Sequence, residues 1–208
     1  MEIYRFGNMS APVILIQPVD GHDLSAIENE IRLIEEDTDR DFGIICIKVD
    51  SWNNDLSPWK APAVFRNESF GEGALLTLEK ILQICDDKTK TYYIGGYSLA
   101  GLFSIWAAYN TDVFKGVAAA SPSVWFPDFI QYMSLHNIEC EAVYLSLGDK
   151  EGNTRNKVMS TVNKCIEEAY EMLKIKGIDT VLEWNSGGHF KDADIRTAKA
   201  FSWLLNRS

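Results

Sequence analysis

Short apolar segments alternate with helical patterns along almost the whole chain, and this alternation constrains the fold more than any other feature. Residues 43–49 (GIICIKV) and 91–96 (TYYIGG) have no clear polar face, which is typical of strands that helices cover on both sides. Apolar residues at helical spacing follow the first apolar segment, as at Ile27, Ile31 and Ile34. Because crossover helices join parallel strands, the sequence predicts an open, mostly parallel sheet with helices on both faces.

The same patterns give approximate bounds for each element. Strands are predicted at 13–16, 43–49, 91–96, 117–121, 142–148 and 180–184, and 2–6 is available as an edge strand. Helices are predicted near 23–34, 73–85, 99–109, 154–176 and 195–205, and the turn-rich segment 51–65 is predicted to be a loop. No repeat or linker interrupts this order, so we expect residues 1–208 to form a single domain with about six to seven strands.

Charge and cysteine usage exclude several kinds of partner. The formal net charge of −10 repels phosphate, so we expect no binding to nucleic acid or to anionic membranes. The start of the chain lacks a basic and apolar leader, and no apolar run approaches the ~18 residues that span a bilayer, which favours a cytoplasmic protein. The cysteines lie far apart, at positions 46, 85, 140 and 165, which favours buried free thiols over a metal or redox site.

Ser98 lies where the predicted strand 91–96 turns into an apolar helix. A sharp turn at this point strains the backbone, and the residues two positions away must be small, as Gly96 and Ala100 are. This is the setting of a nucleophile elbow, in which an exposed serine hydroxyl attacks a carbonyl group. The alternative is that Ser98 only caps its helix.

A serine needs a base to take its proton, and the chain has three histidines. His189 follows the last predicted strand, beside glycines that permit a turn, and it comes after Ser98 as the order of an elbow enzyme requires. His22 follows the first strand but precedes Ser98, and His136 has the pattern of a surface histidine. We therefore expect His189 to be the base.

A carboxylate must hold this imidazole in the correct tautomer and stabilise its charged form. Strand 142–148 ends in GDKE, and we favour Glu151 over Asp149 because it has room to return toward the histidine loop. Asp192 and Asp194 are weaker candidates, since acidic residues suit the first turn of the final helix.

Backbone amides must also stabilise the oxyanion that forms during acyl transfer. The first is expected from Leu99, directly after the nucleophile. The second is expected from the loop after strand 13–16, where Pro18 has no N–H; Val19 is our choice, and Gln17 is almost equally favoured.

Three tryptophans fall in loops that should share the rim of the sheet with Ser98. Trp52, Trp59 and Trp125 are candidates to wall an apolar substrate pocket, and the alternative is that they belong to the core.

The stretches GGYSLAG, ASPSVWFPDF, YLSLGDKE and SGGHF, in this order, resemble the esterase branch of the α/β-hydrolases, which includes the enterochelin esterases and esterase D type enzymes. The resemblance covers nearly the whole chain. It implies an α/β-hydrolase fold and a serine hydrolase that cleaves small carboxylic esters through an acyl-enzyme, with no metal or organic cofactor. The sequence has no insertion long enough for a substantial lid, so we expect a minimal version of the fold. It also implies that Ser98 is the nucleophile, His189 the base and the GDKE carboxylate the orienting acid.

The chain departs from this pattern in two places. Ala100 stands where many relatives have glycine, and Gln17-Pro18 replaces the usual His-Gly after the first strand. Two alternatives to ester hydrolysis stay open. The same nucleophile could pass its acyl group to a sugar or an amine, and the altered oxyanion loop and the uncertain acid favour a silent binding protein that keeps the fold.

Overall fold

The computed structural model describes residues 1–64 and 67–207 and contains a seven-stranded sheet in the order β1-β3-β2-β4-β5-β6-β7. β1 runs antiparallel to β3, and all other neighbouring strands are parallel. This agrees with the mostly parallel sheet predicted from the sequence. The strands are β1 (Glu2–Gly7), β2 (Val13–Val19), β3 (Phe42–Lys48), β4 (Thr91–Tyr97), β5 (Phe114–Ala120), β6 (Ala142–Gly148) and β7 (Asp179–Asn185).

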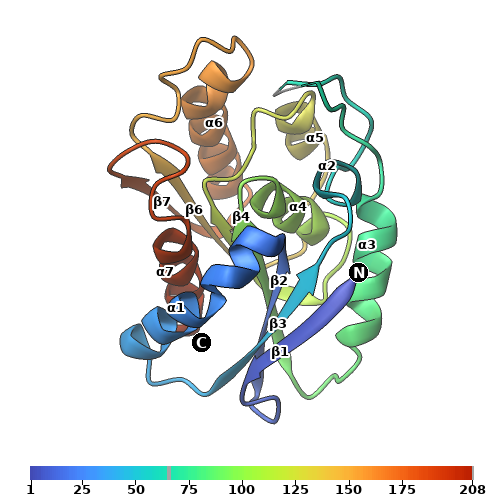
Figure 1. Ribbon diagram of the computed structural model, residues 1–208, viewed down its shortest axis with the longest axis vertical. Coiled ribbons are helices and arrows are strands. Elements are labelled where there is room, and N and C mark those ends of the chain that lie inside the picture. The colour runs from blue at the N-terminus through green and yellow to red at the C-terminus, as the bar shows by residue number, and fades with distance from the viewer. Residues whose placement is uncertain (65–66, 208) are drawn as a thin grey trace.

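Helices cover both faces of the sheet (Figure 1). Side chains alternate along each strand, so Val13 and Leu15 pack against α1 (Gly21–Asp37) and α7 (Ala193–Leu205). Ile14 and Ile16 belong to a second cluster on the opposite face, which the other long helices cover. These helices are α3 (Ala74–Ile84), α4 (Leu99–Ala108), α5 (Phe129–Leu135) and α6 (Val162–Ile175). All residues of α4 are buried, which explains why its sequence is almost wholly apolar.

Two helix starts differ from the sequence prediction, and local hydrogen bonds explain both. α1 begins at Gly21 because the side chain of Asp20 accepts hydrogen bonds from the amides of His22 and Asp23. The helix predicted from 154 begins only at Val162, after a short 3-10 turn. The Asn156 side chain accepts from the amides of the second and third residues after it, which holds the preceding segment in a turn.

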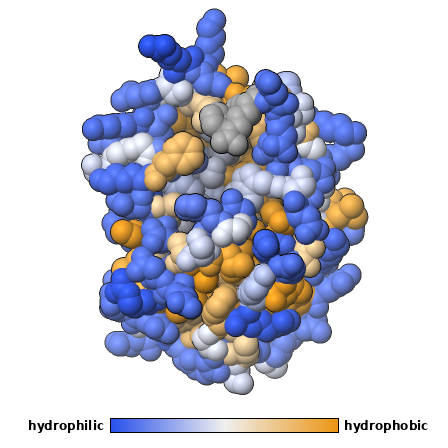
Figure 2. All heavy atoms as spheres, in the orientation of Figure 1, coloured by the Kyte–Doolittle hydropathy of each residue, from blue (hydrophilic) through white to orange (hydrophobic). Residues whose placement is uncertain are grey.

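Two short helices were not predicted. α2 (Trp52–Asp55) lies within the segment predicted to be a loop, whose last residue, at position 65, lies outside the described residues. α5 lies between β5 and β6, in a stretch whose sequence is compatible with either a helix or a loop. Within the described residues, no helix is long and apolar enough to cross a bilayer. Hydrophilic side chains cover most of the face shown in Figure 2, with smaller apolar patches between them.

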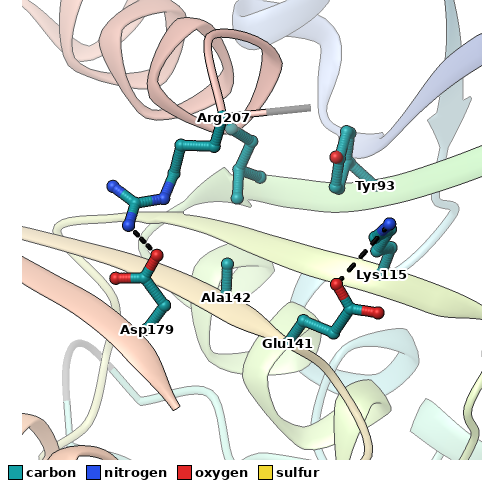
Figure 3. A pocket seen from close by; sticks show the side chains of 7 residues that line it. Tyr93, Lys115, Glu141, Ala142, Asp179 and Arg207 are labelled. Carbon is teal, nitrogen blue, oxygen red and sulfur yellow. Dashed lines mark ion pairs between the residues drawn. The ribbon is translucent and has the colours of Figure 1, made fainter.

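The two ends of the parallel strands differ in character. The amino ends of β5, β6 and β7 line a hollow of about 500 Å³, in which Lys115 pairs with Glu141 and Arg207 pairs with Asp179 (Figure 3). The carboxyl ends of the parallel strands open at the opposite edge of the sheet, where ligands bind in folds of this kind. The loops after β4, β6 and β7 carry the residues described next.

Candidate active site

Ser98 lies at the junction of β4 and α4 in a strained backbone conformation. Its φ of 56° and ψ of −117° fall in a region that residues other than glycine rarely occupy. A Cβ atom at Gly96 would lie 2.7 Å from the Cβ of Ala100, so both positions require small residues. The Ser98 amide donates to Ala120 O at 3.1 Å, and the Ser123 amide donates to Ser98 O at 3.0 Å. Neighbouring segments therefore hold the sharp turn in place.

His189, from the loop after β7, lies between Ser98 and Glu151. Its Nε2 is 2.9 Å from Ser98 Oγ, and its Nδ1 is 2.7 Å from Glu151 Oε2. An ionised carboxylate can only accept a hydrogen bond, so Nδ1 carries the proton and Nε2 is free to accept the serine proton. The hydroxyl of Tyr97 donates to His189 O at 2.6 Å and thereby fixes the backbone of the histidine.

Glu151 comes from the turn after β6, and its side chain is 3% exposed. Burial by itself raises the pKa of Glu151, but the hydrogen bond and charge of His189 and hydrogen bonds from Gly148 and Ser121 lower it further, so the net pKa lies below its usual value. The carboxyl group is therefore ionised at neutral pH and can stabilise a charged imidazole.

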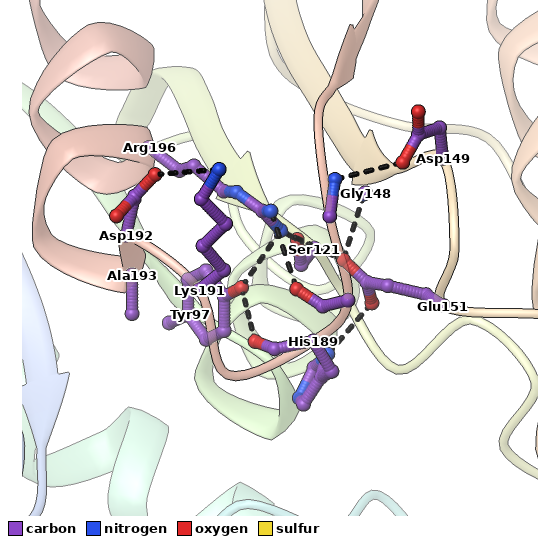
Figure 4. A network of polar contacts seen from close by, with 12 residues as sticks. Tyr97, Ser121, Gly148, Asp149, Glu151, His189, Lys191, Asp192, Ala193 and Arg196 are labelled. Carbon is purple, nitrogen blue, oxygen red and sulfur yellow. Dashed lines mark hydrogen bonds and ion pairs between the residues drawn. The ribbon is translucent and has the colours of Figure 1, made fainter.

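Asp149, the alternative acid, does not reach the imidazole. Its Oδ1 accepts a hydrogen bond from the amide of Gly187 at 2.7 Å, so it holds the base of the loop that carries His189 (Figure 4). Asp192 precedes α7 as its N-cap residue, and Asp194 accepts from Asn29 Nδ2 at 2.6 Å. The structure thus brings Glu151, and not the other candidates, to His189.

The other two histidines are exposed and lie at helix ends, outside the hydrogen-bonded chain of Ser98, His189 and Glu151. His22 is in the first turn of α1. His136 ends α5, where its ring stacks on Tyr132 with centroids 4.2 Å apart.

The candidate oxyanion donors lie at the carboxyl ends of β2 and β4. Leu99 is the first residue of α4, a position whose amide has no partner within its own helix. Val19 ends β2 and is fully buried, and its carbonyl accepts from the Val49 amide at 3.2 Å. The side chain of Gln17 turns toward α1 and donates to Glu30 at 3.3 Å. The choice of Val19 over Gln17 as the second donor stays a prediction.

The three candidate tryptophans are half-buried and pack against the larger core cluster. Trp59 donates through Nε1 to Pro127 O at 3.0 Å, and Trp125 contacts Phe70 with ring centroids 6.2 Å apart. Trp59 also lines a hollow of about 310 Å³ with Tyr132. Trp52 begins α2. All three contribute to packing, and their contact with substrate stays a prediction.

Four polar residues around the triad were not singled out from the sequence. Ser123 Oγ lies 3.2 Å from Ser98 Oγ, and Ser121 donates to Glu151 Oε1 at 2.8 Å. Tyr97 and Arg196 complete this set (Figure 4). The ASPS stretch after β5 was noted only for its resemblance to esterases, and nothing in the local pattern of α7 distinguished Arg196 from a surface residue. Among the described residues, no three histidines, cysteines or carboxylates cluster to hold a metal ion.

No family model matches the chain, and no curated protein matches it in sequence. Solved structures match it closely in shape at low identity. An IroE-like serine hydrolase from Shewanella oneidensis is 13% identical with a TM-score of 0.78, covering 98% of this chain and 75% of that one. An enterochelin esterase from Shigella flexneri is 13% identical with a TM-score of 0.67, covering 99% of this chain and 55% of that one. A monoacylglycerol lipase from Paleococcus ferrophilus is 17% identical with a TM-score of 0.61, covering 100% of both chains.

These matches establish the fold. The chain has the α/β-hydrolase fold predicted from its sequence, and the structural match to esterases of that fold, including an enterochelin esterase, confirms the resemblance at the level of structure. The chain spans about half the length of the enterochelin esterase.

Proposed function

We propose that this protein is a serine hydrolase that cleaves small carboxylic esters, with Ser98 as nucleophile, His189 as base and Glu151 as orienting acid. The observation that carries the proposal is the continuous hydrogen-bonded chain from Ser98 Oγ through the imidazole to Glu151, at 2.9 and 2.7 Å. The strained backbone of Ser98 supports it, because such strain is retained where function requires it.

The chemistry follows from the direction of these hydrogen bonds. His189 Nε2 takes the proton of Ser98 as Oγ attacks the ester carbonyl carbon, and Glu151 stabilises the imidazolium that forms. The Leu99 amide and the second donor, for which we propose Val19, hold the oxyanion of the tetrahedral intermediate. The imidazolium then protonates the departing alcohol, and water repeats the sequence to release the acid.

The surroundings of Ser98 and His189 offer an apolar contact to a substrate. Phe190 follows His189 and is 88% exposed, so an apolar ring is available beside the base. Similar structures include an enterochelin esterase and a monoacylglycerol lipase, which supports carboxylic esters as the substrate class. Transfer of the acyl group to another alcohol would use the same residues, so products formed with an added alcohol distinguish the two reactions.

A Ser98→Ala variant tests the proposal. We expect it to lose roughly 10³-fold or more of the activity on p-nitrophenyl acetate, because the substitution removes the hydroxyl that His189 activates. It should also lose labelling by a fluorophosphonate probe, which reacts with activated serines. Ser134 is exposed on α5 and bonds only within its own turn, so Ser134→Ala is the matched control and should keep both properties. Parent-level hydrolysis by Ser98→Ala refutes the proposal, and an unlabelled parent protein favours a silent binding fold.

A further inference from the structure

Arg196 lies in the first turns of α7 with its guanidinium group directly beside the triad acid (Figure 4). Its side chain is 2% exposed, and it is among the largest fully buried side chains of the described residues. Removing an arginine from water is costly unless a charge partner and hydrogen bonds compensate it. The partners of Arg196 therefore indicate why the chain places a cation here.

The two terminal nitrogens of Arg196 face different segments. Nη1 lies 2.9 Å from Glu151 Oε1, 3.1 Å from the Tyr97 hydroxyl and 3.1 Å from Ser121 Oγ. Nη2 donates to the carbonyls of Gly188 at 3.2 Å and Ser186 at 3.4 Å, both in the loop that carries His189. One side chain thus connects the acid, the loop of the base and the residue before the nucleophile.

Because of these contacts, the two carboxylate oxygens of Glu151 accept hydrogen bonds from different partners. Oε1 accepts from Arg196, from the Gly148 amide at 2.7 Å and from Ser121, so it is fully used. Oε2 is left for His189. A Cβ atom at Gly148 would lie 2.9 Å from Oε1 and 3.1 Å from Arg196 Nη1, so this arrangement requires glycine there.

We propose that Arg196 is a positioning residue that also sets the working pH of the triad, an inference that rests on the proposed function. An unbalanced carboxylate beside His189 would favour the protonated imidazole, which cannot accept the proton of Ser98. The positive charge of Arg196 partly cancels the field of Glu151 at the imidazole. The planar guanidinium group also holds the acid and the histidine loop at a fixed separation.

Other titratable groups around His189 do not supply this balance. The pKa of Tyr97 is raised to about 12 by burial, so its hydroxyl stays neutral. Tyr144, near Arg196, donates to Glu183, which is paired with Lys199. Among the described residues, the remaining charged or titratable groups on the elements that face the histidine loop are Asp149, Lys150, Lys191, Asp192, Asp194, His22, Asp23 and Glu30.

Three variants test the inference, each assayed by the rate of fluorophosphonate labelling and by hydrolysis of p-nitrophenyl acetate between pH 5 and 9. Arg196→Met and Arg196→Gln remove the charge. We expect the acid limb of the rate profile, which is the pH range in which the rate falls on acidification, to move up by about one pH unit or more. Arg196→Lys keeps the charge but cannot span Glu151 and Gly188 together. We expect it to lower kcat about tenfold, with KM and the acid limb nearly unchanged. Circular dichroism establishes folding.

The outcomes separate the alternatives. If Arg196 were merely structural, all three variants would slow the reaction equally at every pH, and this result overturns the inference. An unshifted acid limb in a folded neutral variant overturns it as well. If neither neutral variant folds, Arg196→Lys decides, and full kcat in that variant refutes the positioning role. An unlabelled parent, or labelling that persists in Ser98→Ala, refutes the proposed function instead.

Discussion

Replacing Glu151 by glutamine changes one atom of the carboxyl group and gives the sharpest test of the proposed triad. The amide has a single oxygen, whereas Glu151 uses both of its oxygens as acceptors. Three donors surround the Oε1 position, from Gly148, Ser121 and Arg196, and one donor faces Oε2. The glutamine oxygen should therefore occupy the Oε1 position, so that its NH₂ group faces His189 Nδ1.

An NH₂ group at that position cannot accept the Nδ1 proton, so it favours the tautomer with the proton on Nε2. That proton then points at Ser98 Oγ, 2.9 Å away, and the imidazole can no longer act as the base. The corresponding change in other triads lowers kcat by about 10⁴-fold, and we expect a loss of this size. The substitution also leaves the buried Arg196 without its ion partner, which should lower the free energy of unfolding by roughly 3–5 kcal/mol.

Turnover of p-nitrophenyl acetate and urea unfolding measure the two effects separately. Asp149→Asn is the matched control, because Asp149 lies in the same turn and an asparagine oxygen can still accept the hydrogen bond from the Gly187 amide. We expect this control to keep activity within a few-fold of the parent. A Glu151→Gln variant that is folded and retains more than about a tenth of the parental kcat would contradict the reasoning.

Two further predictions concern stability and the elbow. Burial raises the pKa of Glu30 from 4.5 to about 8, so the folded state binds more protons between these values and the free energy of unfolding should fall as pH rises through that range. The Glu30→Gln variant keeps a polar partner for Gln17 and should show no such fall. At pH 9 its free energy of unfolding, measured by urea titration, should exceed that of the parent protein by a few kcal/mol. An identical pH dependence in both proteins would disprove the assignment. Gly96→Ala places a methyl group 2.7 Å from Ala100, and we expect labelling of the elbow serine to slow at least tenfold. Gly21→Ala, where a Cβ meets nothing within 4 Å, should label at the parental rate, and equal rates for both variants would count against the steric argument.

Features that depend only on neighbouring residues could be predicted from the amino-acid sequence. The alternation of apolar strands with helical stripes predicted the mostly parallel sheet, because periodicity reflects which faces of an element are buried. The small residues around Ser98 predicted the sharp turn at the end of β4, since that steric requirement spans only the five residues from Gly96 to Ala100. His189 was selected by its order in the chain and by its place after the last strand, and the structure brings its ring within 2.9 Å of the serine.

Tertiary structure alone decided which carboxylate meets the imidazole and what holds it there. Glu151 and Asp149 lie two residues apart in one turn, so sequence reasoning could only favour one of them. Their directions are fixed by donors from distant segments, including Arg196, which is 45 residues from Glu151 in the chain. An arginine on a helix is typically exposed, and only the packing of α7 on the sheet reveals that this one is buried and paired with the acid.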